Sequence, residues 1–175
     1  EQQSGLGRNM RAGSRAASTI QRPNVVPSTK KTWKKDCQLG RKPSVLYGLA
    51  HGYFLVNIRD PHDLRTPLIV ASRWGVVPLV KALLLRKADV TLQDVQGNSA
   101  IAFAAQYGHC SIVAMLYNAK EGEKMLEVPN SMDLTPLHRA TMYGNTETAV
   151  FLLEKGSDMF RSDRVGRNAL DYARL

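Results

Sequence analysis

The chain has 175 residues and a formal net charge of +9 at neutral pH. It contains no apolar run of about 20 residues, so the sequence predicts no membrane-spanning helix. Its two cysteines, Cys37 and Cys110, exclude a disulfide-stapled framework and indicate a reducing compartment.

The positive charge is confined to the N-terminal third. Residues 1–59 contain eleven Lys and Arg against two acids, whereas residues 60–175 contain thirteen basic and thirteen acidic residues. Residues 1–43 are rich in Ser, Gly, Arg, Asn and Pro, so we expect a basic, non-globular arm that runs extended over another macromolecule. RNA, an acidic protein groove or anionic lipid headgroups are the candidate surfaces. The residues predicted to bind RNA or an acidic surface are Arg8, Arg11, Arg15, Arg22, Lys30, Lys31, Trp33, Lys34 and Lys35.

The same N-terminal composition, rich in Arg and Ser and nearly free of acids, is typical of an organellar transit peptide. We therefore expect a mitochondrial protein on the matrix side rather than a cytoplasmic one, and we do not expect secretion. After the arm, residues 44–60 are predicted to form a shortened capping helix and a turn, because Ser44–Phe54 is too short for a full repeat.

The remaining chain repeats. Four capping triplets begin 33, 36 and 33 residues apart; they are Thr66-Pro67-Leu68, Ser99-Ala100-Ile101, Thr135-Pro136-Leu137 and Asn168-Ala169-Leu170. The first residue of each can cap a helix, and proline at the first helical position costs no hydrogen bond. A glycine ends each of the first three helices, at Gly75, Gly108 and Gly144. A second apolar helix follows at Leu79–Leu85, Ile112–Leu116 and Ala149–Leu153.

A period near 33 residues with a Thr-Pro-Leu-His core, complete at His138, resembles the ankyrin repeat family. The resemblance implies an all-α solenoid of helix-turn-helix units, with repeats at 61–93, 94–129 and 130–162 and a partial repeat at 163–175. The second repeat carries three extra residues within Lys120–Val128. We expect a longer outer helix or a protruding, solvated loop there.

Catalytic and metal-binding patterns do not emerge from the sequence. None of the four histidines pairs with Cys or carboxylates at a metal-ligand spacing. The resemblance implies that His138 ties its turn together and that His109, after Gly108, is also structural. We therefore expect no enzyme activity, no cofactor, no metal site and no small-molecule substrate.

One set of residues is a candidate protein-binding surface. Trp74, Tyr107 and Tyr143 each precede a helix-ending glycine, so they should align as a ladder along the concave edge. The resemblance implies that this position and the preceding one contact partners; packing of each Tyr on the neighbouring repeat is an equal alternative. The predicted protein-binding residues are Arg73, Trp74, Gln106, Tyr107, Met142 and Tyr143, with Met132 and Leu134 at an exposed loop tip.

The interpretation that fits these features best is a non-catalytic interaction scaffold, a structural subunit of a large assembly such as a mitochondrial ribosome. Its repeats would bind protein, and its arm would bind RNA or an acidic surface. Three alternatives remain. They are an accessory subunit of a mitochondrial respiratory or ATP synthase complex, a soluble regulatory adaptor, and a non-catalytic part of a larger enzyme.

Overall fold

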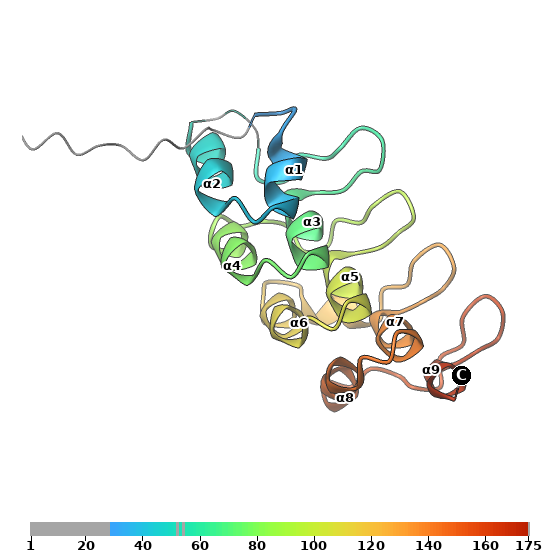
Figure 1. Ribbon diagram of the computed structural model, residues 1–175. Helices are drawn as coiled ribbons and strands as arrows, with labels where there is room; N and C mark the ends of the chain where they lie inside the picture. The colour runs from blue at the N-terminus through green and yellow to red at the C-terminus, as the bar shows by residue number, and fades with distance from the viewer. Residues whose placement is uncertain (1–28, 52, 54, 175) are drawn as a thin grey trace, which may run out of the picture.

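Residues 29–51, 53 and 55–174 are described by a computed structural model (Figure 1). The helices are α1 Trp33–Gln38, α2 Lys42–Ala50, α3 Pro67–Arg73, α4 Val77–Leu85, α5 Ala100–Gln106, α6 Cys110–Tyr117, α7 Pro136–Met142, α8 Thr146–Glu154 and α9 Ala169–Ala173, with a 3₁₀ turn η1 at Glu123–Leu126. Within these residues no β-strand forms, and one isolated antiparallel bridge joins Gln93 and Ser99.

The helices stack in two columns. In Figure 1 the odd-numbered helices form one column and the even-numbered helices form the other, and the loops between pairs project beside the odd column as fingers. We call the surface formed by α3, α5, α7 and the finger loops 60–65, 94–98, 130–134 and 163–167 the inner face. The arrangement confirms the predicted all-α solenoid.

Local sequence explains where the inner helices begin. The side chains of Thr66, Ser99, Thr135 and Asn168 each accept a hydrogen bond from the amide three residues later. These are the predicted N-caps, and each satisfies an amide that the helix leaves without a partner.

Close approach between repeats explains why glycines end the inner helices. Gly75 and Gly108 both have φ of +69°. A Cβ on Gly75 would lie 2.7 Å from His109 Cε1, and one on Gly108 would lie 2.7 Å from Asn145 Oδ1. Both neighbours are needed there, since His109 Nε2 donates to the Arg73 carbonyl (3.2 Å) and Asn145 Nδ2 donates to the Gln106 carbonyl (2.7 Å). These two glycines therefore let the next repeat cap the carbonyl ends of α3 and α5.

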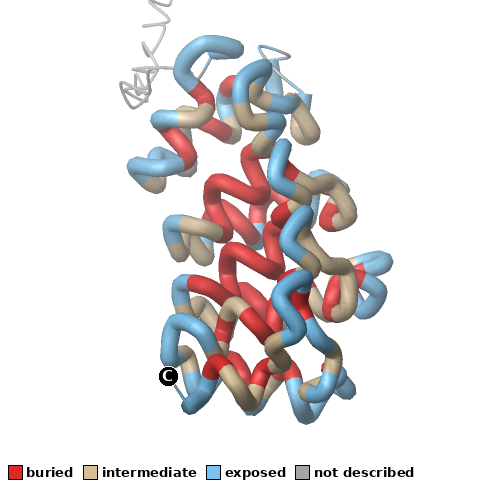
Figure 2. Tube along the Cα trace, turned by 90° about the vertical axis from the view of Figure 1, so that its right-hand side faces the viewer, coloured by how far each residue is buried: buried red, intermediate tan, exposed pale blue. Residues whose placement is uncertain are grey.

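The core lies between the two columns. Figure 2 shows the buried segments as a continuous band along the stack. Its largest fully buried side chains come from both columns and include Leu68, Leu79, Leu83, Ile101, Ile112, Leu116, Leu137 and Leu152. Each repeat therefore buries the apolar side of its neighbour, as in other repeat arrays.

The structure corrects the predicted arm between residues 33 and 43. This stretch forms α1 and the start of α2, and α1 packs beside α3 at the end of the inner column. Trp33, expected to anchor the arm on another macromolecule, is only 3% exposed and belongs to the core together with Cys37. The end of the solenoid is therefore a helix pair, rather than the lone shortened helix expected from residue 44. Residues 1–28, with Arg8, Arg11, Arg15 and Arg22, lie outside the described residues.

The insertion in the second repeat is only partly as expected. Four of its charged residues, Lys120, Glu121, Glu123 and Lys124, are exposed as predicted, whereas Glu127 is half-buried. However, the segment folds back as η1 and buries Met125 and Leu126, so a protruding loop was wrong for these two residues. Gly122 permits the return, because a Cβ there would lie 1.9 Å from the Leu116 carbonyl oxygen.

Candidate protein-interaction site

The finger loops are held in shape by one repeated side chain. Asp60, Asp94, Asn130 and Asp163 open the four fingers, and each side-chain oxygen accepts two backbone amides of its own loop. In the second finger, Asp94 Oδ1 accepts from the amides of Gln96 (3.0 Å) and Asn98 (2.8 Å). The sequence analysis missed this role, although an Asp or Asn recurs five or six residues before each N-cap.

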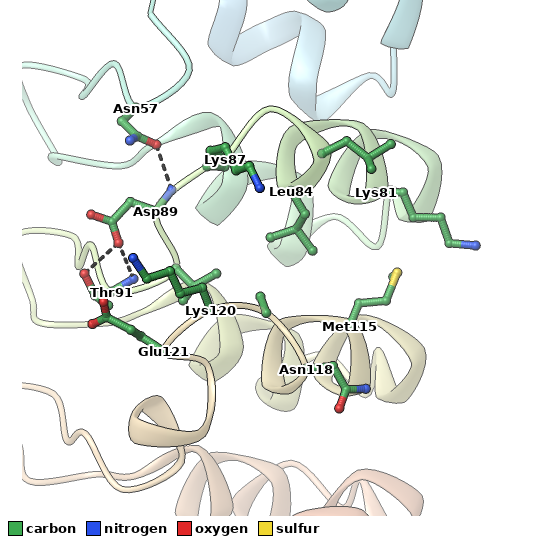
Figure 3. Close-up of a pocket in the computed structure, with 14 residues that line it drawn as sticks. Asn57, Lys81, Leu84, Lys87, Asp89, Thr91, Met115, Asn118, Lys120 and Glu121 are labelled. Carbon is green, nitrogen blue, oxygen red and sulfur yellow. Dashed lines mark hydrogen bonds between the residues drawn. The ribbon is translucent and has the colours of Figure 1, made fainter.

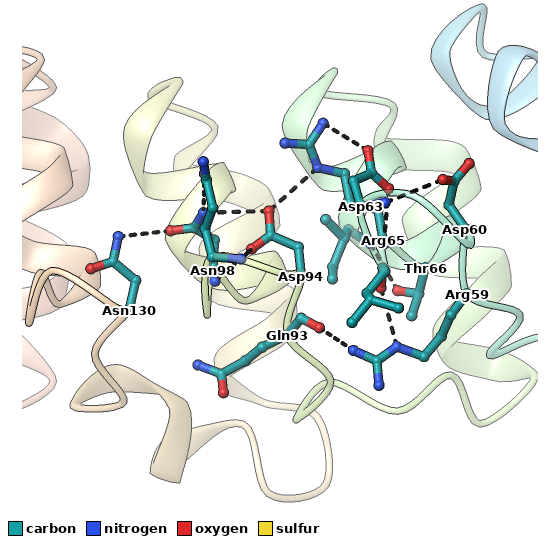
Figure 4. Close-up of polar contacts among 12 residues, drawn as sticks. Arg59, Asp60, Asp63, Arg65, Thr66, Gln93, Asp94, Asn98 and Asn130 are labelled. Carbon is teal, nitrogen blue, oxygen red and sulfur yellow. Dashed lines mark hydrogen bonds and ion pairs between the residues drawn. The ribbon is translucent and has the colours of Figure 1, made fainter.

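Neighbouring fingers are also joined to each other. The amides of Val95, Ser131 and Arg164 donate to the carbonyls of Asp63, Gln96 and Met132 in the preceding finger, at 2.9, 2.9 and 3.2 Å. Side chains add to this row, as Asn130 Nδ2 donates to Asn98 Oδ1 at 2.9 Å (Figure 4). The inner face is therefore a pre-formed surface that needs little ordering when a partner binds.

The predicted aromatic ladder lies open on this face. Trp74, Tyr107 and Tyr143 are 54%, 42% and 55% exposed, so a large part of each residue is accessible to a partner and is not buried between repeats. Trp74 and Tyr107 line a hollow of about 270 Å³ together with Arg73 and His109.

A second hollow of about 290 Å³ lies between the fingers and α7. Met132, Met142 and Tyr143 line it, and all three are exposed. Leu134 also lines this hollow but is only 8% exposed, so the expectation of an exposed Leu134 at the loop tip was wrong. Gln106 is buried as well, and its amide oxygen accepts a hydrogen bond from Arg139 Nη2. Gln106 therefore helps to fix the Arg139 side chain and is itself too buried to contact a partner.

Between the two hollows, three arginines surround one aromatic ring that the sequence analysis did not single out. The guanidinium carbons of Arg65, Arg73 and Arg139 lie 5.1, 5.5 and 5.2 Å from the centre of the Phe103 ring. These are cation–π distances. The sequence does indicate that two of these residues are neighbours, because Phe103 and Arg139 both lie four residues after an N-cap in adjacent repeats.

Arg139 is the most constrained of the three. Its Nη1 and Nη2 donate to the side-chain oxygens of Asn98 and Gln106, while its buried Nε has no hydrogen-bond partner among the described residues. Burial lowers the pKa of the Arg139 guanidinium from its ordinary value, and the positive charge of Arg73 acts in the same direction. The guanidinium is therefore held in place but not fully satisfied.

Some of the predicted RNA-binding residues in the described region are exposed, and others are buried or ion-paired. Lys30, Lys31 and Lys35 are exposed at the α1 end of the solenoid. Lys34 instead forms ion pairs with Asp63 (2.7 Å) and Asp60 (3.2 Å) of the first finger. Together with the buried Trp33, Lys34 serves to attach α1 to the repeats.

A third hollow, larger than these two, lies on the opposite side of the solenoid, between α4 and α6. This outer groove has a volume of about 1120 Å³ and is shown in Figure 3. Its lining combines apolar side chains such as Leu84 and Met115 with three lysines, Lys81, Lys87 and Lys120. The Asp89 carboxylate, which also lines the groove, is already hydrogen-bonded, because its Oδ1 accepts from the amide and the hydroxyl of Thr91 at 2.8 and 2.7 Å.

Two histidines of the repeats, His109 and His138, make structural hydrogen bonds to backbone carbonyls. His138 is fully buried; its Nδ1 accepts from the Thr135 amide (3.2 Å), and its Nε2 donates to the Arg161 carbonyl (2.9 Å). It therefore ties α7 to the next turn. Over the described part of the chain, no three His, Cys, Asp or Glu side chains are grouped as metal ligands would be. No helix described in the structure is long and apolar enough to cross a membrane.

Comparison with known proteins gives similarities confined to the repeats. The chain is 31% identical over 120 residues to the phosphocholine transferase AnkX of Legionella pneumophila, covering 67% of this chain and 12% of AnkX. It is 32% identical over 115 residues to Rabankyrin-5 of Mus musculus, covering 65% and 10%, and 31% identical over 121 residues to the nuclear factor NF-kappa-B p105 subunit of Mus musculus, covering 68% and 12%. The chain thus spans about a tenth of the length of these relatives.

Two family profiles match the chain itself. The profile described as ankyrin repeats (3 copies) matches residues 43–127, and the ankyrin repeat profile matches residues 132–164. These matches cover more than half of the sequence and coincide with the helix pairs from α2 to α8. The chain therefore belongs to the ankyrin repeat family.

Proposed function

We propose that this chain is a non-catalytic subunit of a larger assembly and that it binds a protein partner with its inner face. The observation that carries the proposal is the row of exposed aromatic side chains, Trp74, Tyr107 and Tyr143, beside two hollows. Aromatic residues and arginines are the types enriched at the centres of protein interfaces. The hydrogen-bonded fingers support the same role, because a rigid surface loses little entropy on binding.

The setting that we favour is a mitochondrial ribosome on the matrix side of the inner membrane. The uneven charge supports this choice, since residues 1–59 carry eleven basic residues against two acids. In this proposal the basic N-terminal region contacts RNA, while the neutral repeats bind protein. An accessory subunit of a mitochondrial respiratory or ATP synthase complex is the alternative in which the same charge contacts protein or lipid.

Two further alternatives rest on the relatives. AnkX is by name a transferase, and the matched part is 12% of its length, so the repeats of this chain could serve a larger enzyme in the same non-catalytic way. The match to the NF-kappa-B p105 subunit supports a soluble regulatory adaptor. In both alternatives the inner face keeps its role in binding protein.

Site-directed photo-crosslinking in cells that make the protein tests the proposal. A photoreactive phenylalanine analogue replaces Tyr107 on the inner face or, as a matched control, the exposed Val150 on the outer helix α8. We expect a discrete crosslinked protein from position 107 and none from position 150, and we expect it to co-sediment with ribosomal subunits. Crosslinks from position 150 alone would contradict binding by the inner face. Crosslinks from position 107 without ribosomal sedimentation would contradict the ribosomal setting.

A further inference from the structure

We propose that the inner face takes a partner segment that carries an acidic side chain, and that Arg73 and Arg139 bind its carboxylate beside the Phe103 ring. This inference deepens the proposed function and rests on it, since it names the chemistry of the segment that the inner face would bind.

The first argument is the arrangement of charge in space. Arg65 precedes α3, Arg73 ends it, and Arg139 lies in α7, two repeats away. All three guanidinium groups nevertheless lie within 5.5 Å of the centre of the Phe103 ring in α5. Three cations around one ring repel one another, so this cluster is stable only with compensating negative charge or hydrogen-bond acceptors.

The second argument is that only one of the three arginines forms an ion pair with a described residue. Arg65 forms ion pairs with Asp63 and Asp94, both at 3.4 Å. The Asp94 side chain is fully buried and already accepts from two backbone amides and from Asn98 Nδ2. Its carboxylate is therefore committed within the finger.

The other two guanidinium groups have no carboxylate partner in the described part of the chain. Arg139 is held by the neutral amide oxygens of Asn98 and Gln106. Arg73 lies over the rings of Phe103 and Tyr107, at 5.5 and 5.4 Å, and forms no hydrogen bond through its side chain with a described residue. The charge of Asp94 acts on Arg139 from a distance, but neither Arg73 nor Arg139 has a described carboxylate in direct contact at the centre of the inner face.

The third argument is the shape of the surroundings. Arg73 lines the hollow beside Trp74 and Tyr107, and Arg139 lines the hollow beside Met142 and Tyr143. A carboxylate between the arginines would therefore be flanked on both sides by hollows that suit apolar side chains. This combination favours an acidic residue within an apolar peptide segment over the repeated phosphates of RNA.

A peptide display experiment with the full chain tests the inference. The chain is immobilised, a library of random linear peptides is selected on it, and bound peptides are retested on a variant with Trp74→Ala and Tyr107→Ala. We expect the peptides that need these two aromatic residues to be enriched in Asp or Glu next to apolar residues. A lead peptide is then measured by fluorescence anisotropy. We expect its affinity to fall about tenfold to a hundredfold in R73Q/R139Q, the range for hydrogen bonds to charged groups.

A double-mutant cycle locates the contact. Replacing the acid of the lead peptide by its amide should cost a similar factor on the parent chain and almost nothing on R73Q/R139Q. The charge-matched control is K81Q/R86Q, which removes two exposed cations from α4 and its C-cap and should leave the affinity unchanged. R73Q alone keeps the test informative if loss of Arg139 unfolds the protein, because the Arg73 side chain contacts only the rings of Phe103 and Tyr107 among the interactions of the described residues, and its carbonyl is unchanged by the substitution.

The possible failures are distinguishable. Two outcomes would overturn this inference without contradicting the proposed function. In the first, the peptides that depend on Trp74 and Tyr107 carry no acidic residue; in the second, their affinity is the same for R73Q as for the parent chain. Peptides whose affinity falls only in K81Q/R86Q would assign binding to the outer helix α4 and contradict both. A selection that yields no peptide dependent on Trp74 and Tyr107 would also contradict both.

Discussion

At the scale of single residues, the last finger loop is stabilised by a hydrogen bond that shifts the pKa values of its two partners in opposite directions. Tyr172 Oη donates to Asp163 Oδ2 in the buried base of the loop. Burial acts to raise the pKa of Asp163, but hydrogen bonds from Tyr172 and from the amides of Arg167 and Val165 outweigh it and hold the pKa below its ordinary value. Burial, together with the same carboxylate, raises the pKa of Tyr172 to about 12.

Tyr172→Phe should therefore change stability in a pH-dependent way. The contribution of Asp163 is present above its unfolded pKa of about 4 and is lost as pH falls through the lower folded value. That of Tyr172 is present below about pH 10 and is lost as pH rises toward 12. We expect the variant to lose about 1.5–3 kcal/mol of unfolding free energy at neutral pH. Urea unfolding at acidic, neutral and alkaline pH checks this, because the difference from the parent should shrink at both extremes.

The control for this experiment is Tyr143→Phe. The Tyr143 side chain is exposed, and its hydroxyl makes no hydrogen bond with a described residue, so its removal should change the unfolding free energy little at any pH. A difference between parent and Tyr172→Phe that stays constant from acid to alkali would contradict the assigned hydrogen bond.

A second residue-scale prediction concerns the tips of the fingers. Leu64, Gly97, Asp133 and Gly166 occupy the same place in successive fingers and have φ of +57°, +77°, +60° and +84°. This region costs a non-glycine residue about 1–2 kcal/mol, whereas glycine enters it freely but loses more entropy on folding. We expect Leu64→Gly to stabilise the protein by about 0.5–1 kcal/mol in urea unfolding.

Gly97→Ala is the matched opposite change. It introduces a Cβ 3.1 Å from Asn130 Cα in the same backbone region, so it should destabilise the chain. A lower unfolding free energy for Leu64→Gly would contradict the prediction. It would mean that the exposed Leu64 side chain stabilises the protein by more than its left-handed backbone conformation costs.

How far sequence predicts such details depends on whether they are local. The N-cap of Thr66 and the left-handed Gly75 follow from neighbouring residues, so they were predicted and confirmed. The arginine cluster was missed because Arg65, Phe103 and Arg139 come from three repeats and meet only through side-chain conformation. Trp74, Tyr107 and Tyr143 were predicted to align as a ladder, with packing on the neighbouring repeat as an equal alternative. All three are exposed, and no sequence pattern shows what they bind.

At the scale of helices, α1 is the element that sequence reasoning failed to find. Its N-cap Thr32 makes no side-chain capping bond, and the surrounding residues are mostly basic and polar, so composition favoured an unfolded arm. The available signal was weak, namely Trp33 and Cys37 at a spacing of four, which places both on one side of a helix. Tertiary packing on α3, rather than helix propensity, stabilises this short helix.

Two truncations measure the contribution of α1. Removal of residues 1–28 leaves α1 intact and serves as the reference for the longer truncation. Removal of residues 1–43 deletes Trp33 and Cys37 from the core and exposes α3, so we expect a loss on the order of 3–5 kcal/mol, as for a buried Trp replaced by Ala. Thermal and urea unfolding, with Trp33→Ala as the point variant, provide the measurement. Equal stability of the two truncations would show that α1 does not belong to the folded unit.

At the scale of the whole molecule, charge and apolar surface are separated. Residues 60–175 carry equal numbers of basic and acidic residues, whereas the exposed Lys30, Lys31 and Lys35 lie at the α1 end. In the proposed function the neutral repeats bind protein, and the basic α1 end of the solenoid contacts RNA. Most of the net charge of the predicted arm, residues 1–43, lies between residues 29 and 43, next to or within folded helices.

The salt dependence of binding to single-stranded polyuridylate tests the role of this charged end. Each phosphate contact to single-stranded nucleic acid contributes about 0.7 to the slope of log affinity against log salt, so K30Q/K31Q/K35Q should flatten the slope by about 2. The control is K81Q/K87Q/K120Q, which removes three lysines from the outer groove and should leave the slope unchanged. Equal flattening by both triple variants would mean that polyuridylate senses net charge alone. Because a specific RNA contact requires the charge at the α1 end, that result would contradict the ribosomal setting and favour the regulatory adaptor.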